Sequence, residues 1–395
     1  MLTGLSVILL SGLFMGWLSK KAGLPTLVGM IVVGIVIGPN ALDLISGTVI
    51  DLAASLRQGA LVIILTRAGL SLDISELKKA GRPALLMCFL PAIFEIGATA
   101  LLAPLIFGIS LTDALVTGSV LAAVSPAVVV PRMIRLMDEK YGTDKQIPQI
   151  ILAGAGADDI LVIVLFSAFT AMAQGSGGSA ASSIISVPLS IVLGILLGAL
   201  CGFALDLYFK KVHIRDSVKV IITLSVSCLL IALQDALAGI VSISALIAIT
   251  AWGIVLKKRS PERAARLQLK YNKLWIAAEA VLFVLVGAAV DINDAFTYGG
   301  GAVLLVLSAL LFRMLGVFVC MTGTKLNLRE RLFCMIAFIP KATVQAAIGA
   351  VPLAMGLSCG RLALTCAVLS ILITAPVGAF LIDRSYKRLL CSDGA

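Results

Sequence analysis

The 395-residue chain is 60% hydrophobic and only 13% charged, with a mean hydropathy of +1.10. Soluble domains carry charge on about a quarter of their residues, so this composition excludes a soluble globular protein and indicates a membrane protein. The formal net charge of +10 points to an anionic partner such as nucleic acid, unless the basic residues serve another purpose. The eight cysteines show no Cys-x-x-Cys and no Cys/His spacing, so we expect no metal centre, cofactor or disulfide.

Long apolar segments follow one another along the whole chain. A helix needs about 20 apolar residues to cross a bilayer, and the segments that meet this rule are residues 4–19, 24–40, 52–72, 83–107, 113–134, 147–173, 184–209, 218–234, 238–256, 274–290, 299–322, 331–355 and 361–382. No barrel-like alternation is present, and no basic region precedes the first segment as in a signal peptide. The predicted fold class is an all-α, polytopic membrane protein with about 13 transmembrane helices.

The basic residues gather in alternate loops between these segments. One side of the membrane receives 26 of the 31 Lys and Arg residues, and the other receives Arg361 together with several aspartates. The positive-inside rule then places the N-terminus outside and the C-terminus in the cytoplasm of a multi-pass cell (inner) membrane protein. The positive charge therefore sets the topology, and nucleic acid is rejected as a partner. His213, the only histidine, lies in a basic cytoplasmic loop and is expected to be solvated.

The two halves of the chain repeat each other weakly. The end of the third segment, Gly69–Ile74, resembles the end of the tenth, Gly287–Ile292, and a lone Glu95 in the fourth corresponds at the same offset to a lone Arg313 in the eleventh. A shift of seven spans is odd, so the halves cross the membrane in opposite directions. Spans 1–6 and 8–13 are predicted to form an inverted repeat, an architecture typical of transporters whose site lies at the bilayer midplane.

Adjacent acids, Asp158 and Asp159, lie about 11 residues into the sixth segment, roughly 16 Å deep at 1.5 Å per residue. Ionisable groups at this depth normally border an aqueous cavity or a partner. Hard cations such as Na⁺ prefer oxygen ligands, and two neighbouring carboxylates resist joint ionisation. Cation and proton then compete for one site, which is the minimum that an antiporter needs. The structural alternative is that the pair only bonds nearby helix ends or Lys341.

Two segments carry a proline near their middle. Pro126 follows Ser125 in the fifth segment, and Pro340 precedes Lys341 and Thr343 in the twelfth. Proline removes a backbone hydrogen bond, so both helices are expected to be interrupted and crossed, with Ser125 and Thr343 supplying oxygens to the cavity. The alternative at each position is a simple kink.

Three further charges share the same depth. Glu95 and Arg313 have opposite charge and symmetric positions, so they are predicted to form a buried ion pair; alternatively, each snorkels or bonds the backbone separately. Lys341 either neutralises carbonyl ends at the helix break or pairs with Asp158, and we favour the first.

These motifs resemble a known family. Val124–Pro131, Asp158–Leu161 and Pro340–Ala347 are similar to motifs of the monovalent cation/proton antiporter superfamily, in particular the NHA subgroup of Na⁺/H⁺ antiporters. The resemblance covers essentially the whole chain. It implies the NhaA-like antiporter fold, an elevator movement, and Asp159 as the principal ion-binding carboxylate with Asp158 assisting. Where relatives of NhaA and NapA carry a lysine, this chain has Arg313, which stays protonated at any working pH.

The resemblance also implies a homodimer and a division of the single membrane domain, residues 1–382, which a short cytoplasmic tail at 383–395 follows. The ion-transport bundle would comprise about residues 83–173 and 299–382, and the dimerisation scaffold about residues 1–72 and 184–290.

The sequence as a whole predicts a secondary active transporter, with no enzymatic activity, that exchanges Na⁺ or Li⁺ for protons at Asp159 and Asp158. K⁺/H⁺ exchange and proton-coupled transport of another small substrate remain the alternatives. A channel or K⁺-efflux system gated by a soluble domain is disfavoured, because no Gly-rich nucleotide fold is present. Stoichiometry stays open: the double acid favours an electrogenic cycle and Arg313 an electroneutral one.

Overall fold

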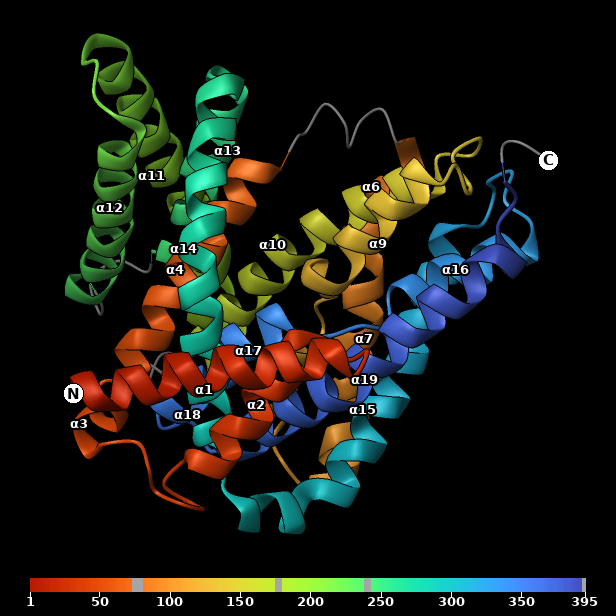
Figure 1. Ribbon diagram of the computed structural model, residues 1–395, viewed down its shortest axis with the longest axis horizontal. Helices are drawn as coiled ribbons and strands as arrows, with labels where there is room; N and C mark the ends of the chain where they lie inside the picture. The colour runs from red at the N-terminus through yellow and green to blue at the C-terminus, as the bar shows by residue number, and fades with distance from the viewer. Residues whose placement is uncertain (73–80, 175–179, 238–242, 393–395) are drawn as a thin grey trace. The chain divides into compact units, whose positions relative to one another are not determined.

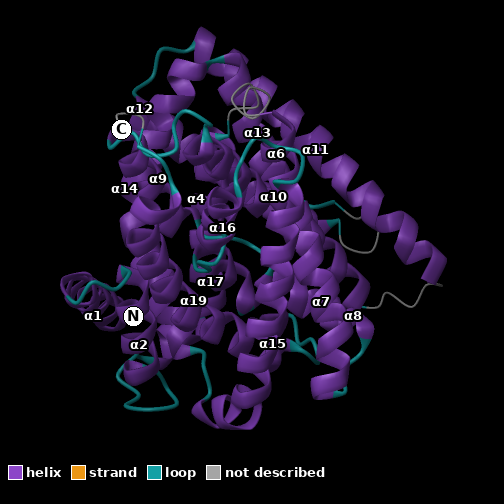
Figure 2. Cartoon of the chain, turned by 90° about the vertical axis from the view of Figure 1, so that its right-hand side faces the viewer, coloured by secondary structure: helices purple, strands orange, loops and turns teal. Residues whose placement is uncertain are grey.

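The computed structural model describes residues 1–72, 81–174, 180–237 and 243–392, and every regular element in these residues is a helix (Figures 1 and 2). Asp73, Lys78 and Lys79, which the repeat and orientation predictions use, lie outside them.

Most of the predicted segments coincide with one continuous helix. These helices are α1 (Leu2–Lys21), α2 (Thr26–Ile37), α4 (Ala53–Ser71), α10 (Ile147–Ala173), α11 (Ala180–Lys211), α12 (Asp216–Ala236), α13 (Ala245–Arg259), α14 (Pro261–Ala288), α15 (Ile292–Cys320) and α19 (Gly360–Leu389). The short helix α3 (Gly47–Asp51) lies between the second and third segments.

The other segments are interrupted helices. The fourth consists of α6 (Gly81–Met87) and α7 (Leu90–Phe107), the fifth of α8 (Leu111–Leu121) and α9 (Pro126–Asp138), and the twelfth of α16 (Leu328–Ala337), α17 (Thr343–Gly349) and α18 (Val351–Ala354). Within the described residues, nine helical stretches are long and apolar enough to cross a membrane. The all-α, multi-pass class is confirmed, and the count of thirteen spans stays a prediction.

The start of α14 differs from the prediction. The apolar pattern predicts a helix from residue 274, but the helix begins at Pro261 and carries Arg263, Arg266 and Lys270 ahead of the apolar segment. Proline at the first helical position and Glu262 in the first turn favour this start, and Ala, Arg, Leu, Gln and Lys are all good helix formers. Hydropathy detects only the part of a helix that lies in lipid.

The chain divides into two compact units. One comprises Met1–Ala54, Ile74–Val162 and Ala280–Ala395, and the other comprises Ser55–Asp73 and Ile163–Glu279. The predicted transport bundle and dimerisation scaffold differ in whether their helices move during transport, which a division into compact units does not test. That division therefore stays a prediction.

Two apolar clusters in the first unit hold the halves of the fifth segment. Leu121 and Ala114 of α8 pack in a cluster with residues of α7, α15 and α19. Val129 and Met133 of α9 pack in another cluster with residues of α6, α10, α15, α16 and α19. Each half-helix thus has its own apolar support, so the break between them is fixed from both sides.

Ion pairs in the same unit join α9 to α19 and the loop before α10 to α16. Asp383 of α19 lies 3.0 Å from Arg132 and 2.7 Å from Arg135, both on α9. Lys145, in the loop before α10, lies 2.7 Å from Glu330 of α16, and this hydrogen bond raises the pKa of Lys145. The half-helices α9 and α16 are therefore each held by ion pairs as well as by their apolar faces.

Glycines let α2 and α14 approach closely in the first unit. A methyl group added at Gly34 would collide with the carbonyl oxygen of Val284, and one added at Gly287 with the carbonyl oxygen of Ile31. Small residues allow such approaches between helices in lipid, where packing drives their association.

We expect Gly34→Ala to lower the melting temperature of the detergent-solubilised protein, because overpacking of this kind costs about 1–3 kcal/mol. The matched control is Gly300→Ala on α15, where an added methyl group meets no atom within 4 Å. Equal melting temperatures for the two variants in a thermal-shift assay would contradict the close crossing.

Candidate ion-binding site

Two helix breaks of the first unit meet directly. The first spans residues 122–125 between α8 and α9, and the second spans residues 338–342 between α16 and α17. The backbone N–H of Ser125 donates a hydrogen bond to the carbonyl oxygen of Pro340 over 2.8 Å. The two interruptions predicted around Pro126 and Pro340 are therefore true breaks that lie against each other.

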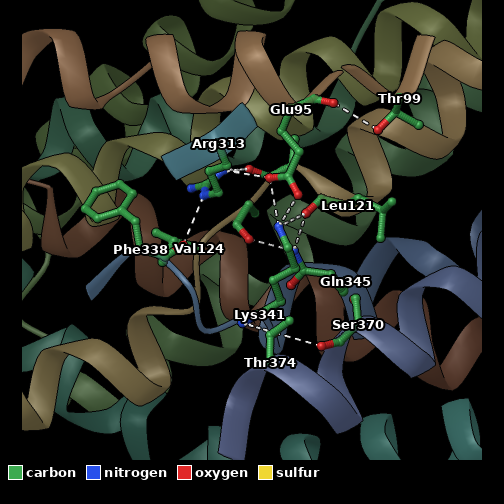
Figure 3. A network of polar contacts seen from close by, with 12 residues as sticks. Glu95, Thr99, Leu121, Val124, Arg313, Phe338, Lys341, Gln345, Ser370 and Thr374 are labelled. Atoms are coloured by element: carbon green, nitrogen blue, oxygen red, sulfur yellow. Dashed lines mark hydrogen bonds and ion pairs between the residues drawn. The ribbon is translucent and has the colours of Figure 1, made fainter. Parts of the chain in front are cut away.

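Carbonyl groups at the end of α8 would be orphaned by the break, because the last turn of a helix has no intrahelical donors for them. Gln345 of α17 donates from its side-chain nitrogen to the carbonyls of Leu121, at 3.1 Å, and Ala123, at 2.7 Å. Lys341 Nζ also donates to Leu121, at 2.6 Å, and an Arg313 nitrogen donates to Ala122 (Figure 3). Side chains from other helices thus complete the end of α8.

Arg313 of α15 is fully buried and has four partners. Its guanidinium lies 3.1 Å from Glu95 Oε2 and 2.6 Å from Asp158 Oδ2. Its Nε donates to the carbonyl of Phe338 over 3.2 Å, in addition to the bond with Ala122. The predicted partners Glu95 and Arg313 are therefore in contact, but Asp158 is a second acidic partner that the sequence did not indicate.

Lys341 has one partner that the sequence did not indicate. Its ammonium group contacts the Leu121 carbonyl, as the favoured alternative required, but it also lies 2.6 Å from Glu95 Oε1 and 2.8 Å from Oε2. Glu95 on α7 thus lies between two cations (Figure 3). The contacts of Asp158 Oδ2 are with Arg313 and with the backbone N–H of Val124, at 2.9 Å.

The two adjacent acids on α10 are both buried. Asp158 is fully buried and Asp159 is 6% exposed, and successive residues on a helix point about 100° apart. The hydroxyls of Ser125 and Thr343 are buried, and neither has a hydrogen-bond partner among the described residues. Carboxylate and hydroxyl oxygens suit a monovalent cation.

Two site residues were missed by the sequence analysis. Gln345 lies on the buried side of α17, and Thr374 of α19 accepts a hydrogen bond from the backbone N–H of Lys341 over 3.0 Å. A polar amide within an apolar segment, two residues after Thr343, was a signal for Gln345. Thr374 had none, because threonine in a membrane helix usually bonds its own backbone.

Fold and site together define a multi-pass membrane transporter. Residues 7–384 match the family model described as "Sodium/hydrogen exchanger, transmembrane", so the chain belongs to the sodium/hydrogen exchanger family. It is a cation/proton antiporter, whose substrates are monovalent cations and protons, and the predicted membership in that superfamily is confirmed.

The chain is similar to curated relatives over most of its length. It is 34% identical over 388 residues to sodium/hydrogen exchanger 9B2 of Homo sapiens, which covers 93% of this chain and 70% of the relative. It is 33% identical over 386 residues to sodium/hydrogen exchanger 9B1 of Mus musculus, with 93% and 66% covered. The sodium proton antiporter MjNhaP1 from Methanocaldococcus jannaschii at pH 8 matches with a TM-score of 0.83 at 19% identity, over 98% of this chain and 97% of that one, and shows the same fold.

Arg313→Lys keeps the positive charge but replaces the planar fork with one ammonium group. A single nitrogen cannot reach Glu95, Asp158 and two carbonyls together, so buried acceptors lose partners at a cost of about 1–3 kcal/mol each. We expect a clear fall in melting temperature. Arg329→Lys, at an exposed position on α16, is the control and should have no effect. If both variants melt like the parent protein, the four-partner role of Arg313 is wrong.

Gln345→Leu preserves volume and removes the amide that bonds Leu121, Ala123 and the backbone N–H of Ala342. Because each buried group left unpaired costs about 1–3 kcal/mol, the melting temperature should drop well below that of Thr365→Val, whose hydroxyl bonds only the carbonyl one turn back in α19. Equal melting temperatures of these two variants would show that the hydrogen bonds of Gln345 do not stabilise the helix breaks.

Proposed function

We propose that this antiporter exchanges Na⁺ or Li⁺ for protons at Asp159, with Asp158 as its assistant. The observation that carries the proposal is the commitment of Asp158 Oδ2 to the Arg313 guanidinium and the Val124 N–H. An acid held by a permanent cation and a backbone N–H is poorly suited to alternate between a proton and a metal ion. We therefore assign the exchange of proton and cation to its neighbour Asp159.

The cation would be held by oxygen atoms around the two helix breaks. Asp159 supplies charge, and the buried hydroxyls of Ser125 and Thr343, together with Asp158 Oδ1, have no hydrogen-bond partner among the described residues. Na⁺ and Li⁺ are hard cations that prefer such ligands. A proton on Asp159 removes the charge that attracts the cation, so the two substrates compete for one carboxylate.

The surrounding charges favour one proton per cation. Arg313 stays protonated at any working pH and cannot carry a transported proton. Lys341 is held by Glu95 and the Leu121 carbonyl. With Asp159 as the single exchanging group, the cycle would be electroneutral.

The same contacts support an elevator movement. Bonds from α7, α10, α15 and α17 converge on the two breaks, so these elements would move as one rigid bundle and carry the ion with them. The further elements of the proposal are a homodimer built on the scaffold helices, a cell-membrane location, an external N-terminus and a cytoplasmic C-terminus.

The test is proton flux in proteoliposomes on addition of Na⁺, Li⁺ or K⁺. We expect flux with Na⁺ and Li⁺ and little with K⁺; flux with K⁺ alone would replace the proposed substrates. Asp159→Asn should reduce the flux to that of protein-free liposomes, because its amide neither releases a proton nor supplies charge.

Asp51→Asn, at an exposed position on α3, removes the same charge elsewhere and should transport normally. Asp158→Asn should keep a reduced flux that still depends on the cation. Cation-dependent flux that survives in Asp159→Asn would overturn the assignment of the carrier.

A further inference from the structure

Helix α19 contacts both interrupted segments of the first unit, although it carries none of the residues proposed to hold the cation. At the second break, Thr374 accepts a hydrogen bond from the backbone N–H of Lys341 over 3.0 Å (Figure 3). A methyl group added at Gly378 would collide with the ring of Pro340, so the two backbones are in close contact. α19 therefore fixes the position of the second break by a hydrogen bond and by close packing.

Farther along the same helix, two residues one turn apart hold the C-terminal end of α9. Asp383 accepts hydrogen bonds from Arg132 with one carboxylate oxygen and from Arg135 with the other, at 2.7–3.2 Å. Tyr386 donates from its hydroxyl to Glu139 over 2.8 Å, and Arg135 lies 5.4 Å from the centre of its ring. Arg135 and Glu139 are themselves 3.8 Å apart, so these side chains form a closed ring of contacts between α9 and α19.

The loop that follows α9 is held in a strained conformation by the same end of the chain. Lys140 has a φ of 57°, at a position after the helix where glycine is usual. Such a backbone persists only where surrounding contacts enforce it. Those contacts include the edge-to-face packing of Tyr141 on Tyr386, at 5.1 Å, and a hydrogen bond from the Gly142 N–H to the carbonyl of Cys391, just beyond α19. The end of α9 is thus fixed through its side chains and through its loop.

A contact at one end of α9 can set the position of the other end. Because α9 is a half-helix, no continuous helical backbone from α8 fixes its position along its own axis. Its 13 residues span about 20 Å at 1.5 Å per residue, and Ser125 is the N-cap at the end opposite Glu139. A hydrogen-bonded helix of this length moves along its axis as a rod, so a displacement of Arg132 and Arg135 also displaces Ser125.

We propose that Asp383 and Tyr386 are positioning residues of the cation site. With Thr374 holding the second break, α19 sets the distance between Ser125, at the first break, and Thr343, at the second. This role rests on the proposed function, which assigns the cation to the hydroxyls of those two residues and to Asp159. Selectivity between cations of equal charge depends on the size and rigidity of the oxygen cage, so a change in this distance alters the affinities for Na⁺ and Li⁺ unequally.

The experiment measures proton flux in proteoliposomes over a range of Na⁺ and Li⁺ concentrations. Asp383→Asn keeps the size of the side chain and removes the charge that holds two arginines. We expect the half-saturating Na⁺ concentration to rise about tenfold, as when a partner of a metal ligand is removed, with a changed ratio between Na⁺ and Li⁺. The maximal flux and the melting temperature should stay close to those of the parent protein, because the Asp383 side chain is 38% exposed and exposed ion pairs add little stability.

Two further variants grade the effect. Tyr386→Phe loses only the hydrogen bond to Glu139 and should cause a smaller shift in the same direction; it provides the test if Asp383→Asn does not fold. Asp383→Glu keeps the charge and should restore most of the parent behaviour. The matched control is Asp138→Asn, which removes the same charge from the exposed last residue of α9 and should leave both half-saturating concentrations unchanged.

Unchanged half-saturating concentrations in Asp383→Asn, or an equal shift in Asp138→Asn, overturn the positioning role. A lower maximal flux and melting temperature without a shift in half-saturation indicate a merely structural contact and also overturn it. Asp159→Asn, measured alongside, separates this failure from that of the proposed function. Flux that survives in Asp159→Asn overturns the carrier assignment, whereas its loss together with parental kinetics in Asp383→Asn overturns the positioning role alone.

Discussion

The structure of the site depends on the burial of Arg313 between two acids. A guanidinium without contact with water is tolerated only when charges and hydrogen bonds replace its hydration. Glu95 and Asp158 supply the charges, and the carbonyls of Ala122 and Phe338 supply further acceptors. Lys341 adds a second cation against Glu95. Two acids and two bases thus form a closed group without net charge.

This neutral group and the helix breaks depend on each other. The breaks expose carbonyl groups at the ends of α8 and α16, which bond the cations, and the backbone N–H of Val124, just before α9, which bonds Asp158. Without the breaks, Arg313 would lose two acceptors. Without the charged side chains, buried peptide groups would lose their hydrogen-bond partners. Removal of one of the four charged residues is therefore expected to disturb both helix breaks. Asp159 is the neighbour of Asp158 in the sequence, and it is proposed to exchange a bound proton for a cation during transport.

Much of this arrangement followed from the sequence. Hydropathy located the helices, the prolines located the breaks, and depth along the helices brought Glu95 opposite Arg313. Counting residues gives depth in the membrane but not the direction in which a side chain points. The sequence therefore did not predict that Arg313 reaches Asp158, that Lys341 reaches Glu95, or that the amide of Gln345 completes α8. The start of α14 was missed for another reason, since its charged first turns are helical without being apolar.

The most direct test of the central claim is the charge moved in each transport cycle. With a neutral group around it, Asp159 carries no net charge across the membrane either with Na⁺ bound or with a proton bound. Proteoliposomes on a solid-supported membrane, given a Na⁺ concentration jump while a dye reports internal pH, should show proton movement without a transport current. A current that accompanies the proton flux and disappears in Asp159→Asn would show that a second group carries charge, and would contradict the account.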